Sequence, residues 1–192
     1  ICKKGDEQKI NASSRILVPG RETTANLLFS MAYPDFTQKE ECLFSEIESK
    51  IMNGEADAGV IIHENRFTYA ERGFAKLRDL GDFWEKRTHT PIPLGAITIR
   101  RDVSDDLKKT INQLLRQSIE YANEHPQASN TFIHEHAQAI QDDVLKQHIA
   151  LFVNEFSLSL GEKGRNAIET LYKNAFAQGI ISSEPKDIFS IL

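Results

Sequence analysis

The stretch GEADAGVIIHENRFTYAE, residues 54–71, decides how this chain can fold. Within it, Ala58 to Ile62 form a short apolar run bounded by turn-forming residues, which predicts a buried strand of a parallel sheet. Ligands of such sheets bind just beyond the carboxyl ends of the strands. His63 and Glu64 follow the strand directly. The sequence therefore places a side chain that titrates near neutral pH where a ligand would bind.

Turn-forming residues divide the first half of the chain into alternating strands and helices. The apolar patterns predict a strand at residues 15–18, helices at 22–31 and 43–53, strands at 58–62 and 74–77, a short helix at 80–86 and a strand at 95–100. Such alternation is typical of an α/β fold. We therefore expect a compact α/β lobe with a parallel or mixed sheet over residues 15–100.

Beyond Arg101 the apolar residues recur at helical spacing. Ser104 is a good N-cap, and it is followed by Asp105 and Asp106, which the helix dipole favours in a first turn. Helices are predicted at 104–124, at 126–138, around 144–153, at 167–178 after an interruption by Gly161 and Gly164, and as a short tail over 185–192. The second half is therefore expected to be helical.

Composition restricts the possible partners. The 192 residues are 40% hydrophobic and 27% charged, which is ordinary for a globular protein, and the net charge of −5 gives no reason to expect nucleic acid or an anionic membrane. No apolar run reaches the roughly eighteen residues that a transmembrane helix needs. Cys2 and Cys42 are far apart and match no disulfide framework or metal-binding spacing. This cysteine usage favours the reducing cytoplasm.

The turn from Pro19 to Asn26 joins the first strand to the first helix. A helix start offers unpaired backbone N–H groups and a positive dipole end, and two hydroxyls, Thr23 and Thr24, stand beside it here. These groups suit a carboxylate. The alternative is that one of the two threonines is only an N-cap, which is the commoner role of threonine at this position.

The remaining histidines give no metal site. His134 and His136 are two residues apart, so on a helix they point about 200° apart and cannot easily share one ion. His148 lies among apolar residues at helical spacing, which is typical of a core position. There is no Gly-rich phosphate loop and no nucleophile-elbow motif. We expect neither a metal nor an organic cofactor.

Several runs of this sequence resemble one family. They are His63-Glu-Asn-Arg66-Phe-Thr68-Tyr69, Asp79-Leu-Gly-Asp-Phe-Trp84-Glu, Pro91-Ile-Pro-Leu-Gly95-Ala-Ile, Arg100-Arg101-Asp102, Val18-Pro-Gly20-Arg-Glu-Thr23-Thr24-Ala and His148-Ile-Ala-Leu-Phe-Val-Asn154. Together they resemble the 1,4-dihydroxy-6-naphthoate synthases, enzymes of menaquinone biosynthesis in the futalosine pathway. The similarity covers nearly the whole chain, and the run through His63 is its most specific part.

The resemblance implies a fold like that of type II periplasmic binding proteins, in which two α/β lobes are joined by two crossing strands. On that template residues 1–11 are a remnant of the first lobe and its crossover, and residues 12–95 are the complete second lobe. Residues 96–192 are the return crossover and the C-terminal helices of the first lobe. The chain begins at Ile1 without methionine, so the N-terminal portion of the first lobe is expected to be missing. A chain with this gap is expected to be inactive alone.

The resemblance also implies a chemistry. His63 corresponds to the family's catalytic histidine and would act as general acid/base in a carbon–carbon lyase. Thr23, Thr24 and Asn26 would contact a small-molecule substrate, cyclic dehypoxanthine futalosine. Glu64 and Arg66 would hold the substrate-contacting residues in place without touching the substrate themselves. The chain could form homo-oligomers.

Two other functions stay open at this point. One is a non-catalytic solute-binding protein of the same fold, and the other is the sister enzyme chorismate dehydratase. The fold alone does not separate the three functions. The run from His63 to Tyr69 fits the naphthoate synthases best.

Overall fold

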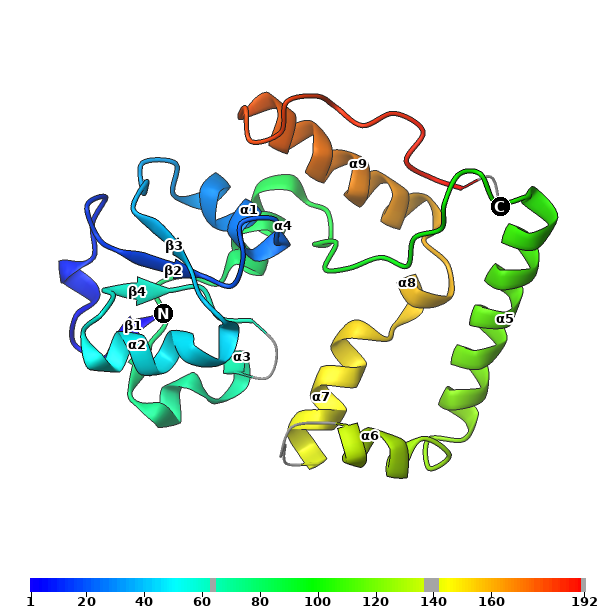
Figure 1. The fold of residues 1–192 in the computed structure, drawn as a ribbon, viewed down its shortest axis with the longest axis horizontal. Helices are drawn as coiled ribbons and strands as arrows, with labels where there is room; N and C mark the ends of the chain where they lie inside the picture. The colour runs from blue at the N-terminus through cyan, green and yellow to red at the C-terminus, as the bar shows by residue number, and fades with distance from the viewer. Residues whose placement is uncertain (63–64, 137–141, 191–192) are drawn as a thin grey trace. The chain divides into compact units, whose positions relative to one another are not determined.

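The computed structural model describes the chain except residues 63–64, 137–141 and 191–192 (Figure 1). The chain divides into two compact units. The first comprises residues 1–92 and 170–184, and the second comprises residues 93–169 and 185–192. Every strand of the described residues lies in the first unit, and the second unit is built from helices and irregular segments. The mixed α/β character predicted from the sequence is confirmed.

The sheet of the first unit has five strands. They are β1 (Cys2–Lys3), β2 (Ile16–Val18), β3 (Lys39–Glu41), β4 (Ala58–Gly59) and β5 (Phe74–Ala75), in the spatial order β3-β2-β4-β1-β5. The central strand β2 pairs in parallel with β3 and β4, whereas β1 runs antiparallel to β4 and β5. The sheet is therefore mixed, and the carboxyl ends of β2, β3 and β4 meet at one edge.

The pairing of β2 with β4 has a fixed register. Ile16 lies opposite Ala58, and Leu17 lies opposite Gly59. The backbone bonding continues past β4, because the N–H of Val60 donates to the carbonyl of Leu17 at 2.8 Å. On the other side of β4, the backbone nitrogen of Ile1 donates to the Gly59 carbonyl at 2.8 Å.

Helices and 3₁₀ turns of the first unit connect these strands. They are α1 (Thr24–Ala32), α2 (Ile47–Asn53), α3 (Asn65–Thr68) and the 3₁₀ turns η1 (Glu7–Lys9), η2 (Phe44–Glu46) and η3 (Tyr69–Arg72), and helix α4 (Leu80–Thr88) follows the last strand. Helix α1 ends just before Pro34, which disfavours helix at the preceding residue. Helix α2 ends where Gly54 takes the left-handed conformation, at φ 79°, that glycine adopts without strain.

The two faces of the sheet carry separate apolar clusters. Ile16, Val18 and Ala58 pack with Phe29 of α1, whereas Leu17 packs with Ile47 and Ile51 of α2. This division follows from the strand period of two residues, which sends successive side chains to opposite faces. Gly59 allows α2 to pack closely on the sheet, since a Cβ at this position would lie 2.5 Å from Cγ2 of Ile47.

A third cluster surrounds Trp84 of α4. The Trp84 side chain is 0% exposed, and its ring N–H donates to the Pro91 carbonyl at 3.3 Å. It packs with Leu28 of α1 and with Leu171 and Ala175, which belong to the part of helix α9 (Gly161–Ala177) that lies in the first unit. The only tryptophan of the chain is therefore a core residue of this unit.

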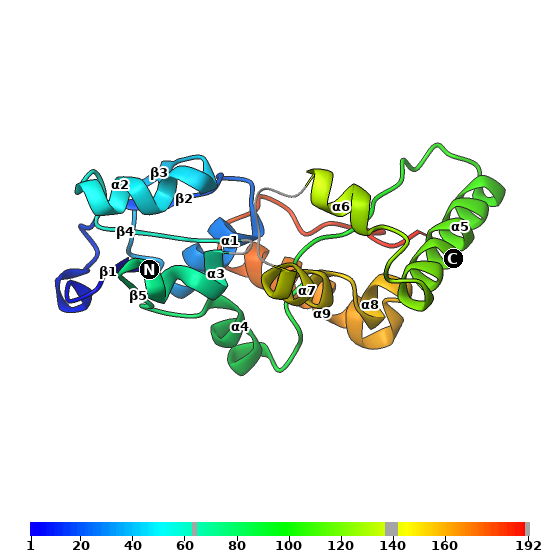
Figure 2. The ribbon, with the colours of Figure 1, turned by 90° about the horizontal axis from the view of Figure 1, so that it is seen from below.

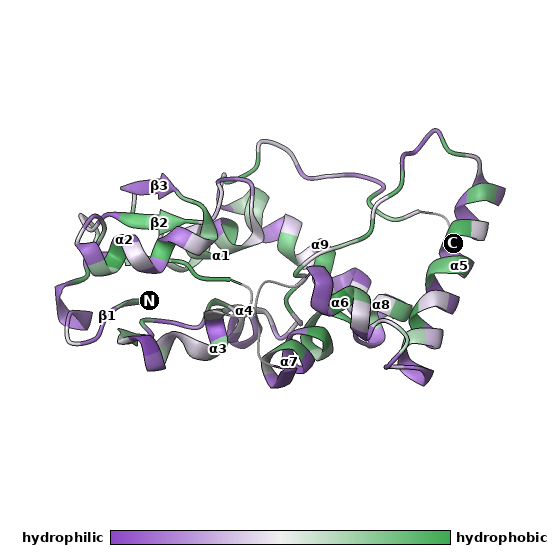
Figure 3. Ribbon diagram, turned by 60° about the horizontal axis from the view of Figure 1, so that its bottom comes forward, coloured by the Kyte–Doolittle hydropathy of each residue, from purple (hydrophilic) through white to green (hydrophobic). Residues whose placement is uncertain are grey.

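The second unit contains a succession of helices (Figure 2). They are α5 (Asp105–Glu124), α6 (Asn130–His136), α7 (Asp142–Phe152), α8 (Glu155–Leu158) and the first part of α9. Ser104 caps α5 by accepting from the Leu107 N–H, as predicted. Figure 3 shows apolar and polar residues mixed along α5, and the side chains of Leu107 and Leu114 are 50% and 59% exposed.

The structure corrects several predicted elements. Residues 95–100 form no strand, although their composition suits one, because they pair with no strand of the described chain, and Ile97 is 76% exposed. Residues 185–190 are irregular rather than helical, and Asp187 has a positive φ that a helix does not accept. The predicted helix from Pro126 begins only at Asn130, since residues 126–129 form a turn.

The predicted interruption at Gly161 and Gly164 is also wrong, because α9 begins at Gly161. Gly164 lies inside its first turns, where a Cβ would come within 3.2 Å of Leu160 and Phe156. A small residue at this position serves close packing against the preceding segment rather than a break. Strand β3 and the short helix α8 were not predicted.

Replacing Gly59 by alanine is expected to lower the free energy of unfolding by about 1–3 kcal/mol, because the added methyl overpacks the contact with α2. The fluorescence of Trp84 during urea unfolding measures this change in the first unit. Gly95→Ala is the control, since its Cβ would meet nothing within 4 Å, and it should change the stability by less than about 0.5 kcal/mol. Equal stability of the two variants would contradict the proposed packing of α2 on β4.

Candidate functional site

The carboxyl edge of the parallel strands carries the predicted site. After β2 the chain turns through Pro19 to Thr23 into α1, and after β4 it runs through Val60 to Ile62. Because β2 and β4 are parallel neighbours, both connections leave the sheet at the same edge. His63 and Glu64, the predicted catalytic residue and its neighbour, lie outside the described residues.

Thr23 is the N-cap of α1. Its hydroxyl oxygen accepts from the N–H of Asn26 at 3.2 Å and donates to the carbonyl of Gly20 at 2.7 Å. The hydroxyl thereby satisfies one of the unpaired N–H groups of the helix start and closes the turn. In this conformation the Thr23 side chain is engaged within the turn, in the capping role considered from the sequence.

The amide of Asn26 also holds the turn. Its Nδ2 donates to the carbonyl of Arg21 at 2.7 Å. A carbonyl oxygen only accepts, so this contact fixes which end of the amide is nitrogen. The Oδ1 atom is buried and meets no hydrogen-bond donor among the residues that the structure describes.

Thr24 and Ala25 carry the hydrogen-bond donors of this helix start that have no partner within the described chain. The N–H groups of Thr24 and Ala25 have no acceptor within the described chain, and the same holds for the Thr24 hydroxyl. Both residues are half-buried. Free N–H groups at the positive end of a helix, with a hydroxyl beside them, form a binding place for a carboxylate.

Arg66 makes contacts within the first unit. Its guanidinium lies 3.9 Å from the carboxylate of Asp79 and 5.6 Å from the ring centroid of Phe67. Asp79 is the N-cap of α4 and accepts from the N–H groups of Gly81 and Asp82. Arg66 therefore links α3 to the start of α4.

One contact at this edge was not predicted. The carboxylate of Glu41, the last residue of β3, accepts from the backbone N–H of Arg21 at 2.5 Å. Residues 21 and 41 are far apart in sequence, so only the pairing of β2 with β3 brings them together. No local sequence pattern indicates this contact.

Among the described residues of the second unit, the histidines form no group of metal ligands. The ring of His134 lies 3.7 Å from Asp142, and Nδ1 of His136 lies 2.8 Å from the Phe132 carbonyl within the same helix. Within the described ranges, no three His, Cys, Asp or Glu side chains are grouped as metal ligands. Both cysteines are buried and unpaired, and burial raises the pKa of each thiol.

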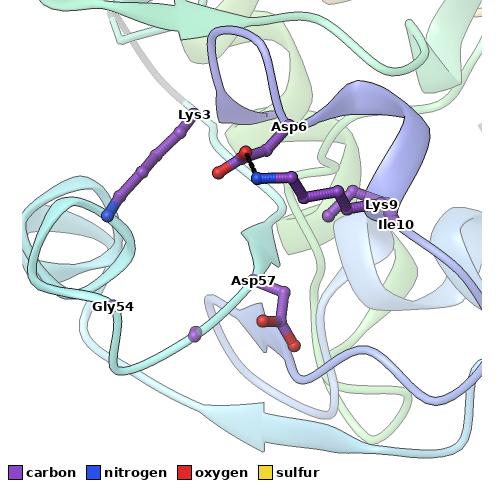
Figure 4. Close-up of a pocket in the computed structure, with 7 residues that line it drawn as sticks. Lys3, Asp6, Lys9, Ile10, Gly54 and Asp57 are labelled. Atoms are coloured by element: carbon purple, nitrogen blue, oxygen red, sulfur yellow. Dashed lines mark hydrogen bonds and ion pairs between the residues drawn. The ribbon is translucent and has the colours of Figure 1, made fainter.

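A small cavity of about 130 Å³ opens elsewhere on the first unit (Figure 4). Its lining includes Lys3, Asp6, Lys9 and Asp57. Lys9 and Asp6 form an ion pair at 2.5 Å, and the Asp57 carboxylate accepts from the N–H of Arg15 at 2.6 Å. Asp57 immediately precedes β4, so the cavity lies at the amino end of this strand, away from the helix start of α1.

The comparisons with known proteins agree on one family. The family described as "Menaquinone biosynthesis" matches residues 1–177. Two similar proteins, from Thermus thermophilus and Streptomyces coelicolor, are named 1,4-dihydroxy-6-naphthoate synthase. Each is 40% identical, over 91% and 86% of this chain and 64% and 61% of their own lengths. The chain thus spans less than two thirds of the length of these relatives.

A solved structure is also similar. It is the crystal structure of a protein from Archaeoglobus fulgidus that is 35% identical, with a TM-score of 0.83 over 88% of this chain and 63% of that one. As for membrane insertion, we find among the described helices none with the length and apolar character that a crossing requires.

Substitutions at the two threonines are expected to separate capping from ligand binding. Thr23→Ala removes the N-cap and should lower the free energy of unfolding by about 1 kcal/mol, whereas Thr23→Ser should retain most of it. Thr24→Val removes a hydroxyl without an internal partner and should change the stability by less than about 0.5 kcal/mol. Urea unfolding followed by Trp84 fluorescence measures all three. A loss in Thr24→Val as large as in Thr23→Ala would show that the two roles are wrongly assigned.

Proposed function

Because the chain belongs to the menaquinone biosynthesis family, we propose that it contributes to a carbon–carbon lyase of the futalosine pathway. The proposed reaction converts cyclic dehypoxanthine futalosine to 1,4-dihydroxy-6-naphthoate. The observation that carries the proposal is the edge where β2 and β4 end in parallel. There, the open helix start at Thr24 and the segment leading to His63 leave the same side of the sheet.

The carboxylate site suits this product. A naphthoate carries a carboxylate, and the N–H groups of Thr24 and Ala25 can bind one with the hydroxyl of Thr24. Thr23 and Asn26 are proposed to shape this site, since their side chains bond within the turn. Glu64 and Arg66 are proposed to support the loop that carries His63.

His63 is proposed as the general acid/base. Removal of a proton precedes the carbon–carbon cleavage, and an imidazole exchanges protons readily near neutral pH. A positioned acid/base of this kind contributes a rate factor of roughly 10²–10⁴. The proposal involves a small-molecule substrate in the cytoplasm, without nucleic acid, membrane, metal or organic cofactor.

The whole enzyme is proposed to have two lobes like a type II periplasmic binding protein. Residues 1–11 would form a remnant of the first lobe and the crossover, residues 12–95 the second lobe, and residues 96–192 the return crossover with the C-terminal helices of the first lobe. The mixed sheet of the first unit and the helices after residue 104 support this division. A substrate held between two lobes needs groups from both.

His63→Ala is expected to lower kcat by roughly 10²–10⁴ in a polypeptide of the relatives' length, because the acid/base is removed. The measurement is turnover of cyclic dehypoxanthine futalosine together with the unfolding transition, which should change little. His134→Ala is the matched control, since it removes a largely exposed histidine of α6 and should leave kcat unchanged. Near-normal turnover in His63→Ala would exclude His63 from the mechanism.

The chain of residues 1–192 is expected to be inactive alone and to self-associate. It spans less than two thirds of its relatives, and α5 exposes apolar side chains such as Leu107 and Leu114. Exposed apolar patches favour association. Turnover and light scattering of the purified chain test this expectation, and a monodisperse monomer with full activity would contradict it.

A further inference from the structure

We propose that Glu41 is a positioning residue that holds the turn between β2 and α1 in the shape that binds the substrate carboxylate. The inference rests on the proposed function for the identity of the ligand. It concerns a residue on the neighbouring strand, twenty positions from the turn, that no feature of the turn itself reveals. Its basis is a set of contacts on both sides of Arg21.

The first contact comes from β3. Glu41 lies opposite Val18 in the β2–β3 register, so its carboxylate is level with the point where β2 ends. Its Oε1 accepts from the Arg21 N–H at 2.5 Å, and its Oε2 lies 3.7 Å from Nε of the Arg21 side chain. A hydrogen bond from a backbone N–H to a carboxylate is stronger than one between neutral groups. The side chain of Glu41 is 52% exposed, so solvent weakens the ion pair more than the backbone contact.

The second contact comes from α1. The carbonyl of Arg21 accepts from Nδ2 of Asn26 at 2.7 Å. Both polar backbone groups of Arg21 are therefore held, one by the strand that flanks the turn and the other by the helix that follows it. Rotation of the peptide units around Arg21 would break at least one of these bonds.

These contacts determine which backbone N–H groups remain free to bind a carboxylate. Thr23 closes the end of the turn through its bonds to Gly20 and Asn26. With the Arg21 N–H bonded to Glu41, the backbone N–H groups of the turn and helix start that have no acceptor in the described chain are those of Glu22, Thr23, Thr24 and Ala25, and the last two belong to α1. Glu41 thus directs an incoming carboxylate to the helix start, and it also excludes that carboxylate from Arg21 by like-charge repulsion.

Two substitutions separate the two effects of the Glu41 side chain, which are its acceptor oxygen and its negative charge. Glu41→Ala removes the acceptor and frees the turn. Glu41→Gln keeps an oxygen acceptor for the Arg21 N–H and removes only the negative charge. Glu40→Ala is the matched control, because it removes the same charge from the adjacent position of the same strand, whose side chain points to the other face.

Hydrogen exchange of the Arg21 amide, measured by NMR on the 192-residue chain without substrate, directly tests whether the Glu41 carboxylate protects this N–H. We expect about tenfold faster exchange in Glu41→Ala, a change within about threefold in Glu41→Gln, and no change in Glu40→Ala. Unchanged exchange in Glu41→Ala would overturn the proposal whatever the enzyme's substrate.

Steady-state kinetics in a polypeptide of the relatives' length test the consequence for binding. Glu41→Ala should raise KM for cyclic dehypoxanthine futalosine about tenfold with kcat unchanged, and Glu41→Gln should restore KM to the wild-type value or below. A fall in kcat with unchanged KM, or a failure of Glu41→Gln to restore KM, would overturn the positioning role. A wild-type enzyme without turnover would refute the proposed function instead, and the exchange of the Arg21 amide would still decide whether Glu41 holds the turn.

Discussion

The parallel pairing of β2 with β4 is the constraint on which the candidate site depends. Ile16 opposite Ala58 and Leu17 opposite Gly59 set a register in which both strands end at one edge. Gly59 is part of this constraint, because its missing side chain lets Ile47 and Ile51 of α2 pack directly on the sheet. A slip of one residue would send Ile16 and Leu17 to the wrong faces and separate the two connections that carry the predicted functional residues.

The chemistry at this edge follows from where hydrogen bonds are used and where they are left open. Glu41, Asn26 and Thr23 bond both backbone groups of Arg21 and the carbonyl of Gly20, and the N–H groups of Thr24 and Ala25 stay open within the described chain, beside the Thr24 hydroxyl. These hydrogen bonds within the chain restrain the turn around Arg21 to one conformation. Because its donors are already ordered before a ligand arrives, binding has little conformational entropy to lose.

Sequence patterns predicted the parts of this arrangement that depend on local chemistry. The apolar runs at β2 and β4, the N-cap Ser104 and the stop at Gly54 are all visible in short windows, and one of the two threonines of the first turn was expected as an N-cap. Strand β3 was missed because Lys-Glu-Glu is a polar edge strand that packs little of its surface, and residues 95–100 were wrongly predicted because strand propensity needs a pairing partner. The contact between Glu41 and Arg21 could not be predicted, since it depends on the order and register of strands.

The central claim is that the helix start at Thr24 and the histidine after β4 serve one ligand. NMR titration of isotope-labelled protein of the relatives' length with 1,4-dihydroxy-6-naphthoate tests it most directly. The account predicts that the amide signals of Thr24 and Ala25 and the ring signals of His63 shift together along one binding curve. Shifts at Thr24 without any at His63, or shifts confined to the cavity around Lys3 and Asp57, would contradict it.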